Sequence, residues 1–315
     1  MSMVSHTVTL KSDRHFGSRI PPSAFGEIMR ELPGAVRQSI RMAFIGRSTR
    51  PGRRQGWLDA ASDIRFMGHS GDDDTILHFE APPFGEAAEQ LYQQKEFWPT
   101  KPEPSDTGFD LLCDVVEDVA AANKDSEKFD SSLLRRLAKF ERGLKHDFQQ
   151  MTIAGHRYSD THPAIIHKPV IDRAKDFFAS TPAPQRVRIV GDLDMVRAST
   201  QAFGLKLDDG QEIRGVLIEG EIVELAELLR RRVLVLGESV FRPSGRLLRI
   251  DADSVQLAGE ESTIWSKVPT PGTGKLDLSD LRRPQGPRSG VAAVIGQWPG
   301  DETDAEINEA LEEMS

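Results

Sequence analysis

Residues 186–258 constrain the possible folds of this chain more than any other segment. Five short stretches alternate polar and apolar side chains, as half-buried β-strands do. The predicted strands are residues 186–190, 203–207, 213–218, 233–237 and 247–250. The letters DDG at 208–210 indicate a tight hairpin turn, and residues 221–230 have helical spacing. The pattern therefore predicts three strands, one helix and two strands.

Three glycines support a small, strongly curved barrel. Gly191, Gly215 and Gly237 fall where such a barrel needs bends or bulges. The order of elements resembles an OB-fold, a five-stranded β-barrel. Many OB-folds bind single-stranded nucleic acid through a basic groove and stacking aromatics. Here the aromatics are Phe203 and Phe241, and acidic and basic residues nearly balance. An architectural or protein-binding barrel therefore stays open beside a nucleic-acid ligand.

Prolines divide the rest of the chain. Pro99, Pro102 and Pro104 mark one connector, and Pro182 and Pro184 mark another. The predicted parts are an α+β domain at 1–98, a mostly helical region at 105–180, the OB-like barrel at 186–258, and a linker with an acidic tail at 259–315. The predicted fold class is α+β and multidomain, with an N-terminal α/β region, a helical region, an OB-like five-stranded β-barrel and an extended C-terminal tail.

Hydrophobic spacing assigns elements to the first two regions. We expect strands at 7–11, 63–67, 75–80 and 150–154, with 63–67 and 75–80 forming a hairpin. We expect helices at 23–44, 84–97, 109–120, 130–144 and 164–179. Pro33 should break the first of these helices, and Asp130 should cap the helix that follows it.

The amino-acid composition limits the partners and the cellular compartment that we expect. With 40 basic and 49 acidic residues, the net charge is −9, which argues against bulk coating of nucleic acid. The single cysteine, Cys113, excludes an internal disulfide framework. The chain holds no apolar run long enough for a membrane span, so we expect no membrane partner. These features predict a protein of the reducing cytoplasm.

No catalytic signature is present. GxSxG, HExxH and the phosphate-binding GxxxxGK[ST] are all missing. His156, His162 and His167 are separated by six and five residues, which does not suit a metal site on a helix. We therefore predict no catalytic residue, no cofactor and no metal, although an enzyme of unfamiliar type stays open for the N-terminal half.

Arginines mark a candidate phosphate-binding surface. The loop at 47–54 has several basic residues and no acidic one, so it could grip phosphates. Loops of the predicted barrel add further arginines. The candidate nucleic-acid-binding residues are Arg47, Arg50, Arg53, Arg54, Arg197, Arg242 and Arg246. The alternative is a surface loop whose arginines pair with the chain's surplus of acidic side chains.

The last twenty residues carry seven acidic residues and no basic one. The sequence GQWPGDETDAEINEALEEMS resembles the C-terminal tails of bacterial antitoxins. That resemblance implies a tail that wraps a toxin, often a PIN-domain ribonuclease, with its acids facing the basic cleft. The predicted partner-binding residues are Trp298, Asp301, Glu302, Asp304, Ile307 and Leu311.

Two functions follow from these patterns. The first is a non-catalytic bacterial cytosolic protein that binds a basic partner protein, with antitoxin-like restraint of a toxin nuclease. The alternative is a nucleic-acid-binding protein that uses the OB-like barrel and the arginine-rich loop at 47–54.

Overall fold

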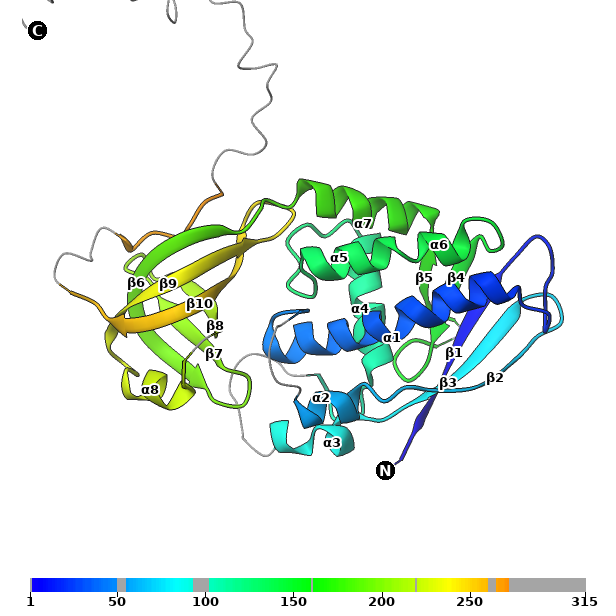
Figure 1. The fold of residues 1–315 in the computed structure, drawn as a ribbon, viewed down its shortest axis with the longest axis horizontal. Helices are drawn as coiled ribbons and strands as arrows, with labels where there is room; N and C mark the ends of the chain where they lie inside the picture. The colour runs from blue at the N-terminus through cyan, green and yellow to red at the C-terminus, as the bar shows by residue number, and fades with distance from the viewer. Residues whose placement is uncertain are drawn as a thin grey trace, which may run out of the picture. The chain divides into compact units, whose positions relative to one another are not determined.

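Two β structures organise the chain, an open sheet and a closed barrel (Figure 1). The structure is a computed structural model that describes residues 2–49, 55–92, 102–159, 161–218, 220–259 and 265–271. The class is α+β, with helices around the open sheet, which confirms that part of the sequence prediction. The predicted tail at 296–315 lies outside the described residues.

The open sheet has five antiparallel strands in the order β2-β3-β1-β4-β5. The strands are β1 (Val4–Lys11), β2 (Arg65–Ser70), β3 (Thr75–Ala81), β4 (Gln150–Ala154) and β5 (Ala164–His167). The predicted hairpin is confirmed, because β2 pairs with β3. Strand β1 alternates and buries His6, Val8 and Leu10. Strand β4 pairs with β1, so the sheet draws strands from both sides of the 99–104 connector.

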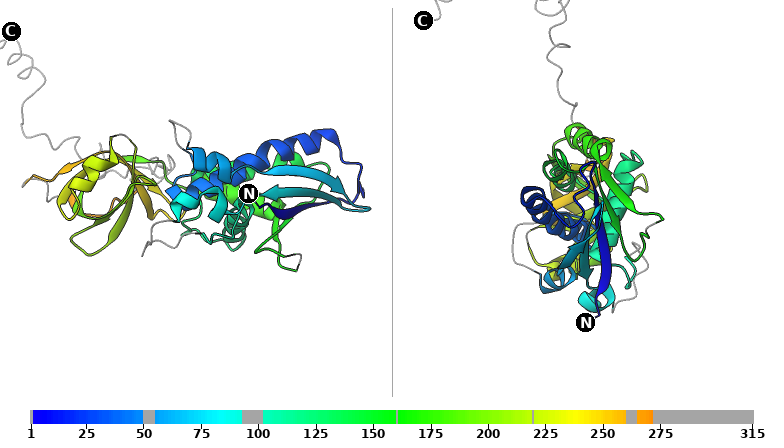
Figure 2. Two further views of the ribbon diagram at one scale, coloured as in Figure 1. Left: turned by 90° about the horizontal axis from the view of Figure 1, so that it is seen from below. Right: turned by 90° about the vertical axis from the view of Figure 1, so that its right-hand side faces the viewer.

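Helix α1 (Pro22–Ile45) runs alongside this sheet (Figure 2). The predicted break at Pro33 is wrong, because α1 continues through it. The apolar face explains why: Ile28, Leu32 and Val36 are fully buried on both sides of the proline. Their burial, at roughly 2 kcal/mol for each side chain, offsets the lost hydrogen bond.

Residues 164–179 were predicted as one helix, and this prediction is also wrong at its start. Residues 164–167 form β5, which pairs with β4, and α7 (Lys168–Ser180) begins only afterwards. The two isoleucines of β5 favour a strand, and Pro169 lies in the first turn of α7, where a proline fits.

The remaining helices around the sheet are mostly short. They are α2 (Gly56–Ala61), α3 (Phe84–Ala87), the 3₁₀ turn η1 (Glu89–Leu91), α4 (Gly108–Ala120), α5 (Ser131–Ala138) and α6 (Glu141–Leu144). The predicted helix at 130–144 is therefore two helices, and the one at 84–97 is α3 and η1 as far as residue 92. The predicted cap is confirmed, because Asp130 accepts the N–H groups of Ser132 and Leu133. Helices α5 and α7 lie side by side (Figure 1).

The second β structure is a closed five-stranded barrel in the order β10-β8-β7-β6-β9. Its elements are β6 (Gln185–Arg197), β7 (Ala202–Lys206), β8 (Glu212–Leu217), α8 (Ile222–Glu227), β9 (Arg232–Phe241) and β10 (Leu247–Leu257). Strands β8 and β10 are parallel, and all other neighbours are antiparallel. The predicted succession of three strands, a helix and two strands is confirmed, and this mixed barrel is compatible with an OB-like barrel.

A close approach inside the barrel explains one of its glycines. Gly215 on β8 faces Phe203 on β7 in the strand register. A Cβ atom at Gly215 would lie 2.1 Å from the Phe203 ring, which is far inside van der Waals contact. The Phe203 ring is fully buried in the barrel core, so it has no room to retreat.

No helix in the described part of the chain is both long enough and apolar enough to cross a bilayer. Cys113 is buried on α4, and burial raises the pKa of its thiol well above the ordinary value. A thiol that stays protonated is a weak nucleophile, which agrees with a packing role.

Candidate functional site

A cavity of about 1100 Å³ opens on one side of the barrel. Its barrel wall comes from the end of β6, from β7 and β8, and from the turn between β9 and β10. The other wall includes Met42 and Gly46 at the end of α1, together with Glu127. Five arginines line it, and we call it the arginine cavity: Arg197, Arg214, Arg242, Arg246 and Arg249. The acidic residues Glu127, Asp194 and Glu212 also line the cavity, so the five arginines leave a smaller positive excess, which suits an anionic ligand.

Arg249 is the most buried of the five arginines. Its Nε donates to Asp251 Oδ1 at 2.8 Å, and its Nη2 lies 3.4 Å from Asp130 Oδ2. The third nitrogen, Nη1, is buried and has no hydrogen-bond partner among the described residues. The side chain is 6% exposed. Arg249 is therefore held in place by two carboxylates, which balance its positive charge.

Asp130 joins this charge network to the start of α5. It accepts hydrogen bonds from the Ser48 amide and hydroxyl while it caps α5. Burial acts to raise the pKa of Asp130, but Arg249 and the Ser48 hydrogen bonds outweigh it and hold the pKa below its ordinary value. The carboxylate is therefore ionised when it meets Arg249.

Arg214 projects from the middle of β8 and has no hydrogen bond or ion pair within the described chain. Its guanidinium lies against Gly46, because a Cβ there would meet Arg214 Cζ at 2.8 Å. Burial is the largest cause of a lowered pKa for Arg214; Glu127 opposes the shift, and Arg197 adds to it. Gly46 ends α1 with φ at 83°, so the negative end of the helix dipole faces this cation.

Arg242 and Arg246 flank the turn between β9 and β10, and acidic groups hold both. Arg242 Nη2 lies 2.7 Å from Glu127 Oε1, and Arg242 Nη1 donates to the Asp125 carbonyl at 2.6 Å. Arg246 Nη1 is 3.7 Å from Asp125 Oδ2. Ser244, at the tip of the turn, donates its hydroxyl to the Asp125 carboxylate at 2.6 Å. The turn is thus tied to residues 125–127, which lie between α4 and α5.

The described residues that line the arginine cavity include cations but no exposed aromatic side chain. Phe203 and Phe241 are 0% and 1% exposed, and both belong to buried cores. Trp265 is partly exposed and lies beneath the Arg188 guanidinium, but neither residue is among those that line the cavity. The chemistry at the wall therefore suits phosphates better than stacked bases.

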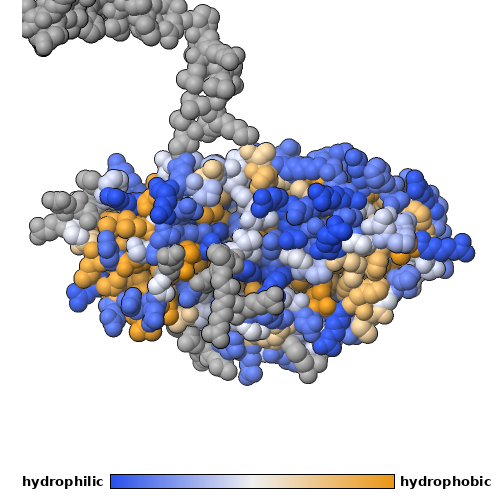
Figure 3. Space-filling view, in the orientation of Figure 1, coloured by the Kyte–Doolittle hydropathy of each residue, from blue (hydrophilic) through white to orange (hydrophobic). Residues whose placement is uncertain are grey.

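Exposed apolar side chains lie elsewhere. In Figure 3 the hydrophobic surface gathers over the barrel and over one region near the open sheet. Exposed large apolar residues within the described segments are Phe66, Met67, Ile165, Phe178, Val223, Leu229, Leu257 and Trp265.

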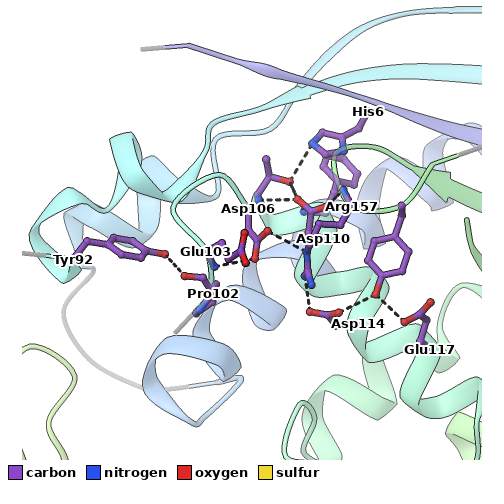
Figure 4. Close-up of polar contacts among 12 residues, drawn as sticks. His6, Tyr92, Pro102, Glu103, Asp106, Asp110, Asp114, Glu117 and Arg157 are labelled. Atoms are coloured by element: carbon purple, nitrogen blue, oxygen red, sulfur yellow. Dashed lines mark hydrogen bonds and ion pairs between the residues drawn. The ribbon is translucent and has the colours of Figure 1, made fainter. Parts of the chain in front are cut away.

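A second polar cluster joins β1, α4 and the segment after β4 (Figure 4). Thr107 and Asp110 form the capping box of α4, and the Thr107 hydroxyl lies 3.0 Å from Nε2 of the buried His6. The His6 ring stacks on Phe109 at a centroid distance of 4.6 Å. Burial lowers the pKa of His6 to about 4, partly opposed by Asp110. His6 is therefore neutral at pH 7.

Arg157 supplies the positive charge of this cluster. Its Nε lies 3.0 Å from Asp106 Oδ1, and its Nη2 lies 2.7 Å from Asp114 Oδ2 (Figure 4). The Tyr158 hydroxyl lies 2.8 Å from Asp114 Oδ1 and 2.9 Å from Glu117 Oε2, and it donates its single proton to one of them at a time. Burial, with these contacts, raises the pKa of Tyr158. Most of these groups are thus partnered within the cluster, as expected of a network that fixes the start of α4.

Donor atoms of Asp106, Asp110 and His156 lie within 4.8 Å of one another. This spacing would admit a cation. However, both Asp110 oxygens already accept hydrogen bonds, from Thr107 and from the Arg157 amide. Arg157 also lies beside Asp106. Arg157 therefore supplies positive charge beside these carboxylates.

The structure brings together some of the residues that the sequence singled out. Arg197, Arg242 and Arg246 all line the cavity. Arg47 lies nearby, 13% exposed, with Nε 3.3 Å from Asp251 Oδ2. Arg50, Arg53 and Arg54 lie outside the described residues. So do Trp298, Asp301, Glu302, Asp304, Ile307 and Leu311, so the partner-binding assignment stays a prediction.

Sequence reasoning missed Arg214 and Arg249, because it looked for binding residues in loops. Both lie within strands whose neighbouring positions are buried and apolar. An arginine inside such a strand is unusual and is the signal that could have found them.

Comparison with known proteins adds no assignment. No family model, no curated protein and no solved structure matches this chain.

Proposed function

We propose that this protein is a non-catalytic nucleic-acid-binding protein whose OB-like barrel holds the phosphates of a single strand in the arginine cavity. The observation that carries the proposal is the position of the five arginines. OB-folds bind oligonucleotides on the face of their second and third strands, between the loops after the first and fourth strands. In this barrel those strands are β7 and β8, and those loops are residues 198–201 and 242–246.

The positions of the arginines support the same face of the barrel as the binding face. Arg197 ends β6 beside the first loop, Arg242 and Arg246 flank the second, and Arg214 lies on β8 between them. Arg214 has no hydrogen-bonding partner of its own in the described chain, so a phosphate would gain a charge-assisted bond without breaking one. Because Phe203 is buried, we expect contacts to phosphates to dominate and base sequence to matter little.

The test is fluorescence anisotropy with labelled single-stranded DNA and RNA, with a duplex as comparison. Arg214→Gln should weaken binding and lower the slope of log affinity against log salt by about 0.7, the value for one single-strand phosphate contact. Arg231→Gln is the matched control, because Arg231 is exposed on the same barrel and does not line the cavity. Arg246→Gln is a second variant. Because the Arg246 side chain is 73% exposed, this substitution should leave the fold intact.

Absence of binding at about 100 µM protein in moderate salt would refute the proposal, since non-specific binding alone reaches that range. So would an equal loss of affinity in Arg231→Gln and Arg214→Gln.

A second candidate function rests on the acidic end of the chain. The seven acids and the apolar stretch before them favour a basic partner protein that the tail would wrap, as the resemblance to antitoxin tails implies. We keep this as a separate proposal, because its residues do not include any that line the arginine cavity.

A further inference from the structure

Among the described residues, three acidic residues line the arginine cavity, Glu127, Asp194 and Glu212, and Glu127 forms an ion pair with an arginine of the cavity. Glu127 lines the cavity, and its Oε1 accepts Arg242 Nη2 at 2.7 Å. Glu127 is also the carboxylate whose charge acts on the half-buried Arg214. Its side chain is 69% exposed, so it reaches this position from solvent and can leave it at little cost in packing.

The other contacts of this segment hold the backbone in place. The Asp125 carbonyl accepts Arg242 Nη1 at 2.6 Å, and the Asp125 carboxylate accepts the Ser244 hydroxyl at 2.6 Å. Arg242 therefore keeps one bond to the segment even when Glu127 swings away. The guanidinium stays in position while its second nitrogen becomes free for another anion.

We propose that Glu127 occupies a phosphate subsite between Arg242 and Arg214, and that a phosphate of the bound nucleic acid displaces it. This inference rests on the function proposed above and adds its regulation. A carboxylate and a phosphate oxygen accept the same guanidinium hydrogen bonds, so they compete for one place. An anion with too few phosphates to displace Glu127 therefore binds more weakly.

The experiment measures affinity for a labelled single-stranded DNA in the wild-type chain and in Glu127→Gln. The variant should bind about fivefold more tightly or better, because it removes a negative charge within about 4 Å of the phosphate position. Glu224→Gln is the matched control: Glu224 is exposed on α8 of the same barrel and does not line the cavity. It should change the affinity by less than about twofold.

A double-mutant cycle with Arg242→Gln tests the mechanism. If Glu127 competes for Arg242, the gain from Glu127→Gln should shrink clearly when Arg242 is already glutamine. Melting curves of all variants check that the fold is kept.

Three outcomes would overturn the inference. Glu127→Gln that binds no more tightly than Glu224→Gln excludes competition. Glu127→Gln that binds more weakly shows that Glu127 positions Arg242 for the ligand. If wild type and every variant fail to bind, the proposed function is itself wrong and the inference falls with it; only this last result affects both.

Discussion

Protonation of His6 should destabilise the fold below neutral pH. His6 is 2% exposed, lies against Phe109 and shares a hydrogen bond with Thr107. Burial and the nearby His156 lower its pKa from 6.5 to about 4, although Asp110 acts in the opposite direction. The unfolded chain therefore binds a proton at this residue at a pH where the folded chain does not.

The direction and size of the pH effect on stability follow from this difference in pKa between the folded and unfolded chain. A depressed pKa gives stability that is present in full above about pH 6.5 and is lost as the pH falls towards 4. Between pH 7 and pH 5 the loss should reach about 2 kcal/mol, given 1.4 kcal/mol for each pH unit in which only the unfolded state is protonated. For a protein of ordinary stability this is a large fraction of the total.

Urea unfolding at pH 7 and pH 5 measures the effect. His6→Gln removes the titration, so it should lose about 2 kcal/mol less than the wild type between the two pH values, while the carboxylates contribute equally to both. His146→Gln is the control, because His146 is exposed. The reasoning is refuted if wild type and His6→Gln lose the same free energy on acidification.

Three further predictions test other parts of the fold. Gly215→Ala should destabilise the barrel by about 1–3 kcal/mol, measured by thermal melting, because its Cβ would collide with Phe203; an unchanged melting temperature would contradict the packing. Asp130→Ala should cost about 3 kcal/mol or more in urea unfolding, because it removes the α5 cap and leaves Arg249 with one carboxylate; a loss below about 1 kcal/mol would mean that the network contributes little. Deleting residues 296–315 should abolish capture of a basic partner protein and leave the melting temperature of the rest unchanged; unfolding would instead assign these residues to the core.

Local patterns predicted the barrel well. Polar and apolar side chains alternate along its strands, and the DDG turn lies in the loop between β7 and β8. Residues that are neighbours in the sequence therefore already indicate where the strands and the turn lie. The same holds for Asp130, whose capping bonds reach only two and three residues along the chain. Features of this kind are visible in the sequence because their causes are short-range.

Long-range packing explains where prediction failed. The path of α1 through Pro33 depends on burial against α4, α5 and α6, and β5 exists because β4 provides its hydrogen-bonding edge. The helices that cover α1 lie far from it in the sequence, and β4, although it is the element before β5, is separated from β5 by residues 155–163. The His6 cluster is similar, because it joins residue 6 to residues 106–117 and 156–158. No spacing along the chain indicates that these groups meet.

The net charge of −9 and the arginine cavity act over different distances, and together they shape how a nucleic acid would bind. At long range the chain repels a polyanion, and salt screens this repulsion beyond about 10 Å at 0.1 M. In the cavity, each phosphate contact becomes weaker as salt rises. The two effects oppose each other, so the observed salt slope should be shallower than the number of contacts implies. The same long-range repulsion disfavours coating of a duplex, so under the proposed function the shape and charges of the cavity would select a single strand.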